Sequence, residues 1–480
     1  MSDLPKWVQN LLPIVILLAV IGLVLWRLPK VELGHSKAFK RRRTFNWVPL
    51  GLTYAFLYFG RYNINEATSA LKATSNNDFG TIFGVGAIVY GFAFLINGPL
   101  TDKLGGRKTI LIAAVGAAAA NALLGLVTYA MLAHGWTPPG GLVATFSVIY
   151  AVNMYFQSFG AVSIVKVNAQ WFHVRERGVL GGVFGVLISL GIYFAYDWSA
   201  AIASALPTHF IFFIPAAVLA LFFLIDLFII RDTPSKAGFE DFDTADASSG
   251  DTGPALGVVT VFKRMITNPV ILIILSVEFC SGFLRNAIMQ WGRKYAVQTG
   301  LADGSFIFGN WGLVLCIAGI LGGMFAGVIS DRIFGSRRGP VSAVLYGGML
   351  VGAIITAFLL GSPALGWLVA FMSLCVIGVH GMLSGTASMD FGGKKNAGVA
   401  VGIIDGAVYV GTAAQSVLLG RILPRGELAA DPANWTNWPI AMIPVALVGF
   451  VLTTRIWNAT AKRAAPAPKP VEPALEPKAG

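Results

Sequence analysis

The sequence has few charged residues. Asp, Glu, Lys and Arg together make up 12% of its 480 residues, whereas hydrophobic residues make up 56%. Soluble domains carry roughly 25% charged residues, because their surfaces face water. A chain with so little charge cannot cover a water-facing surface of this size. The scarcity of charge therefore excludes a soluble globular protein and predicts a protein embedded in a lipid bilayer.

Cysteine is also scarce. The three cysteines, Cys280, Cys316 and Cys375, each lie inside an apolar run. Disulfide frameworks and zinc sites need cysteines at short and regular spacings, and this sequence has none. We therefore expect three free thiols packed among helices, with no metal site.

Two further observations limit the function. The nucleotide-binding pattern G-x-x-x-x-G-K-[ST] does not occur, so nothing in the sequence points to an ATP-driven pump. The formal charge is +12, but the Lys and Arg residues form short clusters between apolar runs, as in membrane proteins that fix their orientation this way. We expect no enzymatic activity, no cofactor and no nucleic-acid partner.

Apolar runs long enough to cross a bilayer, about 20 residues each, recur along the chain. An N-terminal run covers residues 8–28. Two sets of six follow it, at 45–68, 79–101, 108–133, 141–168, 176–203 and 208–230, and at 269–295, 305–329, 340–361, 364–388, 396–422 and 437–457. The pattern predicts an all-α membrane protein of two six-helix bundles related by pseudo-two-fold symmetry, with one extra N-terminal transmembrane helix.

This pattern divides the chain into five parts. Residues 1–43 hold the extra helix and a basic linker, 44–231 the first bundle and 269–459 the second bundle. Residues 232–268 contain EDFDTADASSGDTG and no apolar periodicity, which is typical of a linker, although an acidic regulatory patch is the alternative. The tail 460–480 is rich in Pro, Ala and charge, so we expect it to be disordered.

The basic clusters alternate between loops. Arg41, Arg42 and Arg43 precede the run at 45–68, and further clusters follow at every second loop. Because Lys and Arg favour the cytoplasmic side, we expect these loops and the C-terminus in the cytoplasm of a bacterial inner membrane. The N-terminal run has Lys6 before it and seven cations from Arg27 to Arg43 after it. This charge order disfavours a cleaved signal peptide and favours an extra helix with a periplasmic N-terminus. We expect a monomer.

The two bundles repeat a loop motif. GPLTDKLGGRKT (98–109) and GVISDRIFGSRRGP (327–340) lie at equivalent places, with Asp102 and Asp331 229 residues apart. Such repeats are typical of transporters whose halves rock about a central site. The glycines allow close approach of helix ends, and the Asp can pair with cations of the adjoining loop as a gate latch. The candidate gate residues are Gly98, Asp102, Gly105, Arg107, Asp331 and Arg332.

Arg61 and Arg285 lie at matching places in the first helix of each bundle, 224 residues apart. An Arg in the middle of a membrane helix costs at least about 2.5–3.5 kcal/mol. In a two-fold arrangement the two guanidiniums face each other across the centre, where their forked donors match the oxygens of a phosphate dianion. The alternative is a structural ion pair, for which Glu278, two turns before Arg285, is a conceivable partner.

The loop motif and its copy resemble the signature of the major facilitator superfamily. Four further segments resemble, more narrowly, the organophosphate:phosphate antiporters, which include glycerol-3-phosphate and hexose-phosphate carriers. These segments are YFGRYN (58–63), QWFHVRERG (170–178), FLRNAIMQW (283–291) and DFGGKKNAGVAVGIIDGAVYVG (390–411). The likeness covers about residues 43–460 and implies that Arg61 and Arg285 form the phosphate site.

The resemblance adds two candidate substrate-binding residues, Lys166 and Tyr58. Lys166 matches a family cation, and it either lines the cavity or reaches the interface as an anchor. Tyr58 lies one turn before Arg61, where its phenol either donates to phosphate or packs as an aromatic. Tyr409 matches a family aromatic, and we expect it to pack.

The sequence also departs from the family. Carriers of the glycerol-3-phosphate type have Lys at the position of Phe94 and His at that of Ile188, while Cys316 replaces an acid. The resemblance therefore does not predict the organic part of the ester. Asp226, Glu278 and Asp405 are instead acids inside apolar runs. Each could carry a proton, bind a hydroxyl or balance an Arg, and a structural pairing is favoured for any one of them.

Together these features predict a secondary transporter that exchanges an organic phosphate ester for inorganic phosphate by alternating access. The first alternative is a proton- or cation-coupled symporter of another organic anion, with Glu278 or Asp405 as its titrating group. The second is a transporter-like sensor of an organic phosphate, which only the extra helix and the acidic linker favour.

Overall fold

The computed structural model describes residues 6–27, 33–71, 74–173, 176–244, 257–334 and 337–458. Side chains are described for these residues except 6–13, 24–25, 27, 177–184, 258, 331 and 384–398. The tail 460–480 and part of the predicted linker, 245–256, lie outside the described residues. Within the described part of the chain, all regular elements are helical, which confirms the predicted fold class.

The N-terminal half contains eight α-helices. They are α1 (Lys6–Arg27), α2 (Lys37–Ala70), α3 (Asn76–Leu104), α4 (Gly106–His134), α5 (Gly141–Trp171), α6 (Arg177–Tyr193), α7 (Ser199–Ala205) and α8 (Phe210–Ile229). A π-helical turn, η2 (Phe194–Trp198), joins α6 to α7, so these elements form one continuous helical path. A short 3-10 turn, η3 (Ser235–Ala237), follows.

The C-terminal half repeats this plan. Its elements are α9 (Val258–Ile266), α10 (Pro269–Asn286), η4 (Ala287–Trp291), α11 (Gly292–Gln298), α12 (Phe306–Gly309), α13 (Trp311–Ile333), α14 (Arg338–Phe358), α15 (Leu365–Ile422), η5 (Gly426–Ala430), η6 (Pro432–Trp435) and α16 (Asn437–Arg455). The π-helical turn η4 joins α10 to α11, just as η2 joins α6 to α7.

Eleven helical segments in the described ranges are long and apolar enough to cross a membrane. They do not include α2, which is 34 residues long but begins with the basic stretch that contains Arg41, Arg42 and Arg43. Local sequence sets the helix starts. Asn268 caps the backbone N–H groups of Val270 and Ile271 at the start of α10, and Ser75 forms a capping box at the start of α3.

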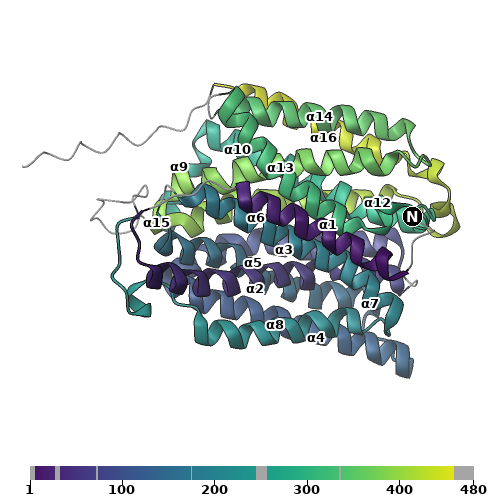
Figure 1. Ribbon diagram of the computed structural model, residues 1–480. Coiled ribbons are helices and arrows are strands. Elements are labelled where there is room, and N and C mark those ends of the chain that lie inside the picture. Colours follow the sequence, from purple (N-terminus) through teal and green to yellow (C-terminus); the bar gives the residue numbers. More distant parts are fainter. Residues whose placement is uncertain are drawn as a thin grey trace, which may run out of the picture.

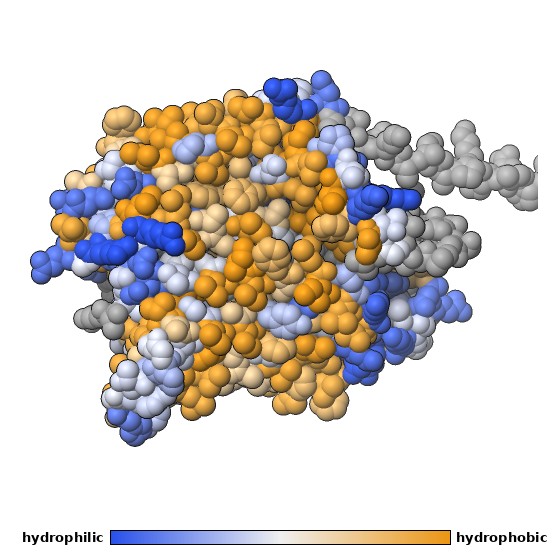
Figure 2. All heavy atoms as spheres, turned by 180° about the vertical axis from the view of Figure 1, so that it is seen from behind, coloured by the Kyte–Doolittle hydropathy of each residue, from blue (hydrophilic) through white to orange (hydrophobic). Residues whose placement is uncertain are grey.

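The long helices run side by side in one direction (Figure 1). The first bundle fills the lower half of this view and the second bundle the upper half. Figure 2 shows an apolar belt with hydrophilic side chains gathered at both ends, as a membrane-spanning surface requires. We call the end where α2, α4, α10 and α14 begin the basic end, and the other the opposite end.

The two bundles meet along α3 and α15, and we call this contact the seam. Glycines permit this approach: a Cβ on Gly91 would lie 3.1 Å from the carbonyl oxygen of Gly406. Nearer the opposite end, a Cβ on Gly420 would lie 3.0 Å from the Cα of Gly80. Larger residues at these positions would hold the two bundles apart.

Helix α1 also lies against both bundles. Its residue Leu17 is 4% exposed, and it belongs to one cluster with Val186 and Tyr193 of α6 and with Leu313 and Cys316 of α13. In Figure 1 α1 begins at the opposite end. Because α6 belongs to the first bundle and α13 to the second, α1 bridges the seam.

One expectation from the sequence needs correction. Residues 258–266 of the predicted linker form α9, whose Val261 and Met265 are buried against Ile271 and Ile404. The spacing of four between Val261 and Met265 is the helical signal that a linker would lack. The helices predicted at 364–388 and 396–422 are confirmed as two apolar spans, Leu365–Leu383 and Val399–Ile422, and the backbone of α15 stays helical between them.

Candidate functional site

Arg61 lies in the middle of α2 and is fully buried. Its Nε donates a hydrogen bond to Gln157 Oε1 at 2.8 Å, and Nη2 donates to Tyr90 Oη at 2.9 Å. Its Nη1 donates to the hydroxyl of Tyr409. All three acceptors are neutral, so they satisfy the donors of the guanidinium without balancing its charge.

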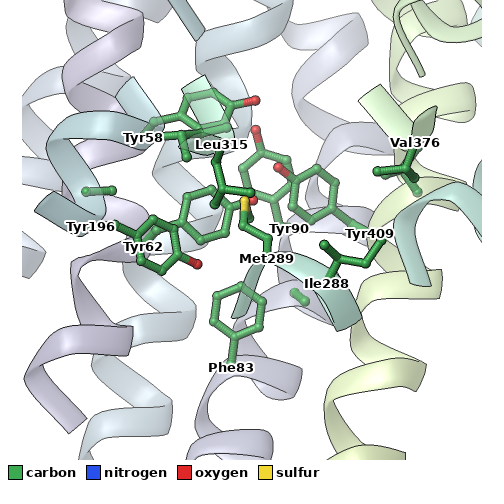
Figure 3. Close-up of a cluster of buried hydrophobic side chains, with 14 of the residues drawn as sticks. Tyr58, Tyr62, Phe83, Tyr90, Tyr196, Ile288, Met289, Leu315, Val376 and Tyr409 are labelled. Carbon is green, nitrogen blue, oxygen red and sulfur yellow. The ribbon is translucent and has the colours of Figure 1, made fainter. Parts of the chain in front are cut away.

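Four tyrosines surround this guanidinium. Its carbon lies 4.5 Å from the ring centres of Tyr58 and Tyr90, 5.9 Å from that of Tyr62 and 5.8 Å from that of Tyr409. Figure 3 shows these rings packed with Leu315 and Met289 in one buried cluster between the helices. Aromatic faces attract a cation, more strongly where water is excluded. Tyr409 comes from α15, so Arg61 of the first bundle is held partly by the second.

A buried polar network fixes the backbone beside Arg61. Asn153 of α5 and Asn121 of α4 each donate to the carbonyl oxygen of Gly60 at 2.9 Å. Gln157, the acceptor for Arg61, donates in turn to Asn153 at 3.0 Å. Because these side chains are fully buried and come from two neighbouring helices, they determine the direction in which the Arg61 side chain extends.

Arg285 lies in α10, immediately before the π-helical turn η4, and is 7% exposed. Its Nε is buried and has no hydrogen-bond acceptor. Ile288 and Met289 of this turn lie in one buried cluster with Tyr58, Tyr62, Tyr90 and Tyr409 (Figure 3). The two arginines and the tyrosines therefore share one region between the bundles.

Neither arginine forms an ion pair within the part of the chain that the structure describes. Glu278, the structural partner considered for Arg285, pairs with another residue: its Oε2 lies 3.0 Å from His380 Nδ1. Two hydroxyls near Arg285, Tyr62 Oη and Ser281 Oγ, are buried without partners. The site thus combines two uncompensated guanidiniums with uncommitted hydrogen-bonding groups, which suits a dianion.

Of two further acids in the membrane-spanning helices, Asp226 is buried and Asp405 is partly exposed. Asp226 of α8 accepts a hydrogen bond from Thr53 at 2.7 Å inside the first bundle. Asp405 lies on α15 one turn before Tyr409. Among the described residues, no group of three Cys, Asp, Glu or His residues lies close enough together to hold a metal ion.

Lys166 lies at the basic end rather than beside Arg61. Its Nζ is 2.7 Å from Asp102 Oδ1, and α5 carries it nine residues beyond Gln157, or about 13 Å along the helix. The pair joins α5 to the loop motif after α3. The structure thus associates Lys166 with the predicted gate residues and not with the arginines.

The first copy of the loop motif is tied to the end of α8. Gly105 separates α3 from α4 with φ +87°, and a Cβ there would lie 3.2 Å from the Asp232 carboxylate. Asp232 accepts from the backbone N–H of Arg107 at 2.8 Å, while the Arg107 guanidinium donates to Leu227 O. In the second copy Arg332 is exposed, and the side chain of Asp331 lies outside the described residues.

Polar contacts join the two bundles at the opposite end. Arg293 of α11 forms a two-pronged ion pair with Glu66 of α2, at 2.8 and 3.2 Å. Lys294 donates to Thr68 at 3.2 Å, and Asn76 and Gln298 exchange hydrogen bonds at 3.0 and 2.9 Å. Together these contacts close the opposite end.

Sequence reasoning missed several of these residues. Tyr62, Tyr90 and Gln157 were not among the candidates, and Tyr409 was expected only to pack. A weak signal was available for Tyr62 and Gln157. Tyr62 follows Arg61 directly, and Gln157 is a polar residue inside an apolar run. Arg293 and Glu66 gave no signal, since each lies near the end of an apolar run where charge is ordinary.

Comparisons with known proteins agree with this architecture. The model of the Major Facilitator Superfamily matches residues 50–416. The glycerol-3-phosphate transporter of Bacillus subtilis is 26% identical over 466 residues, covering 91% of this chain and 98% of that protein. A probable hexose phosphate transport protein of Chlamydia trachomatis is 24% identical and covers 88% of this chain and 93% of its own length.

Two other matches are informative. The membrane sensor protein UhpC of Escherichia coli is 24% identical, covering 91% of this chain and 96% of that protein. Among solved structures, a mutant of the nucleoside transporter NupG has a TM-score of 0.58 at 14% identity, covering 87% of this chain and 98% of that one. The last likeness concerns the fold alone.

Proposed function

The chain belongs to the major facilitator superfamily, and we propose that it is a secondary transporter that exchanges a small organic phosphate ester for inorganic phosphate. In this proposal Arg61 and Arg285 bind the phosphate group, and the organic part of the ester lies against the surrounding tyrosines. The basic end faces the cytoplasm of a bacterial inner membrane, and the monomer is the working unit.

One observation carries the proposal: among the described residues, neither of the buried guanidiniums of Arg61 and Arg285 has a carboxylate partner. A buried charge is costly unless it is paired. A phosphate dianion offsets both charges, and its oxygens accept from guanidinium forks two at a time. The buried Nε of Arg285 and the hydroxyls of Tyr62 and Ser281 supply further hydrogen-bonding groups.

The same charges favour exchange over one-way leak. When phosphate is bound, its charge balances the arginines, so the two bundles can close around it. When it leaves, the like charges repel each other and resist closure. Arg61 also donates to Tyr409 across the seam, and a phosphate oxygen that accepted this N–H would release that contact between the bundles.

The names of the relatives support a phosphorylated substrate. The Bacillus relative is named for glycerol 3-phosphate and the Chlamydia relative for hexose phosphate, and each alignment covers nearly the whole of both proteins. Both substrates are phosphate monoesters of polyhydroxylated compounds, and the phosphate is the group that carries their charge. A site built around guanidiniums is the kind that this shared group requires.

Labelled phosphate tests the proposal. Vesicles containing the purified protein and preloaded with unlabelled phosphate should take up labelled phosphate from outside. Arg61→Lys and Arg285→Lys should each lower this exchange at least about 100-fold, because lysine keeps the charge but loses the fork. Arg425→Lys, at an exposed site near the opposite end, is the matched control. Wild-type vesicles without uptake would refute exchange.

Sensing is the second candidate function, because a membrane sensor protein is as similar to this chain as the hexose phosphate relative is. A sensor would bind the ester at the same arginines without moving it. Phosphate that stabilises the purified protein against heat, but is not exchanged by the vesicles, would favour this alternative.

A further inference from the structure

Glu278 is a buried acid on the same helix face as Arg285. It precedes Arg285 by seven residues on α10, which places it two turns, or about 10 Å, nearer the basic end. Its side chain has no exposed surface. A carboxylate in this position interacts electrostatically with the arginine pair without contacting it.

The two oxygens of Glu278 differ in their surroundings. Oε2 shares a hydrogen bond with His380 Nδ1 at 3.0 Å, whereas Oε1 is buried and has no partner. His380, on α15, keeps 24% of its side-chain surface exposed. The pair therefore joins a buried carboxylate that can accept a proton to an imidazole that is partly exposed.

The titratable groups around Glu278 come from three helices. His380 and Asp405 approach from α15, Arg285 acts from α10 itself, and the Tyr346 hydroxyl of α14 donates to the neighbouring Val277 carbonyl at 2.6 Å. Two other helices, α9 and α16, pack against α10. Their only titratable or charged groups lie near the helix ends and are exposed: Lys263, Arg264 and Arg455.

We propose that Glu278 and His380 form a proton-binding site that is coupled to anion binding at Arg61 and Arg285. The inference rests on the proposed function. With Glu278 ionised, the three groups carry a net charge of +1, which a monoanion balances. With Glu278 protonated they carry +2, which a dianion balances.

Binding of a dianion therefore favours proton uptake. The proton comes from water through the imidazole of His380: Nε2 takes up a proton while Nδ1–H passes its proton to Glu278 Oε2, which leaves a neutral imidazole and a neutral carboxylic acid. Linkage requires the converse, so the protonated site must bind the dianion more tightly. A dianion then crosses with one proton, whereas a monoanion crosses without one.

Glu278→Gln mimics the protonated acid at every pH. Wild-type and variant proteins see the same mixture of phosphate species, so the ratio of their phosphate Kd values isolates Glu278. The Kd of the wild type divided by that of the variant should be near one at about pH 5.5. It should rise to roughly tenfold at about pH 8, as expected for charges about 10 Å apart. Glu427→Gln, exposed near the opposite end, should give a ratio near one throughout.

A ratio that does not change with pH overturns the proton site while leaving the arginine site intact. Wild-type protein that binds no phosphate at any pH would instead refute the proposed function. If Glu278→Gln does not fold, calorimetry of wild-type protein in two buffers at about pH 7.5 decides. Uptake of about 0.5 proton or more beyond phosphate's own titration supports the proton site, and a smaller uptake overturns it.

Discussion

At the residue scale, the notable property of Arg61 is that its acceptors are neutral. Gln157, Tyr90 and Tyr409 satisfy its donors, so the guanidinium keeps its full charge. A carboxylate in any of these places would have cancelled the attraction for an anion. Tyrosine is well suited here, because its ring face also attracts the cation while its hydroxyl accepts from it.

Tyr409→Phe tests this arrangement. Loss of the hydroxyl leaves one buried Arg61 donor unpaired, at a cost of about 1–3 kcal/mol. We expect a lower Tm without phosphate and a smaller difference from wild type when phosphate is present, because a phosphate oxygen can accept from the same donor. Tyr129→Phe, at an exposed site on α4, serves as the control. An equal loss with and without phosphate would contradict the idea.

The arginines could be found from sequence because a charge inside an apolar run is conspicuous. Tyr90 and Tyr409 could not, since tyrosine is ordinary in a membrane helix and only the packing of α3 against α15 brings both to Arg61. Lys166, a candidate from the family resemblance, pairs with Asp102 at the basic end. The depth of a residue along a helix decides which partners it can reach.

At the element scale, the path from α10 through η4 to α11 connects the site to the opposite end. Arg285 lies immediately before the π-helical turn and Arg293 lies just after it. π-helical turns in α-helices are frequent at functional sites. A rotation of this path would therefore move the anion site and the Glu66–Arg293 pair together.

Glu66→Gln should loosen the opposite end. It leaves the largely buried Arg293 without its carboxylate partner. The free energy that holds the two bundles together at this end should fall by on the order of 2–3 kcal/mol. A cysteine placed at Gln298 should then react several-fold faster with a membrane-impermeant thiol reagent. The three native cysteines are buried and should react slowly.

The matched double variant, Glu66→Arg with Arg293→Glu, should restore slow labelling because it reverses the pair without removing it. Fast labelling in the double variant would show that the ion pair does not close this end.

Most helix boundaries could be predicted from the sequence to within a few residues, because apolar runs and caps such as Asn268 mark them. The linker helix α9 escaped notice since nine residues give a weak periodic signal beside an acidic stretch. The two apolar spans of α15, Leu365–Leu383 and Val399–Ile422, were both predicted, whereas the helical backbone between them was not.

At the scale of the whole molecule, the seam between α3 and α15 governs how closely the bundles meet. Gly80 lies against the backbone of Ser416 and Gly420 near the opposite end, and Gly91 meets Gly406 further along. Backbone contact of this kind has no flexible side chain that could give way. Close helix contact through small residues is how membrane helices associate without a hydrophobic driving force.

Gly80→Ala should separate the bundles at the opposite end. The added methyl meets backbone atoms, so the helices must move apart, at a cost of about 1–3 kcal/mol. Phosphate exchange should fall at least tenfold, while phosphate should still stabilise the protein against heat. Gly323→Ala, where a Cβ has open space, should leave both properties unchanged. Normal exchange in Gly80→Ala would show that the seam tolerates separation.

The unpaired arginines also determine how the protein responds to voltage. Moving one elementary charge across 100 mV costs about 2.3 kcal/mol. An empty carrier would move a net positive charge through part of that field, whereas the proposed carrier, loaded with a dianion and with Glu278 protonated, moves no net charge. A membrane potential would therefore oppose the empty step in one direction and leave phosphate-for-ester exchange nearly unaffected, so the exchange would be electrically silent.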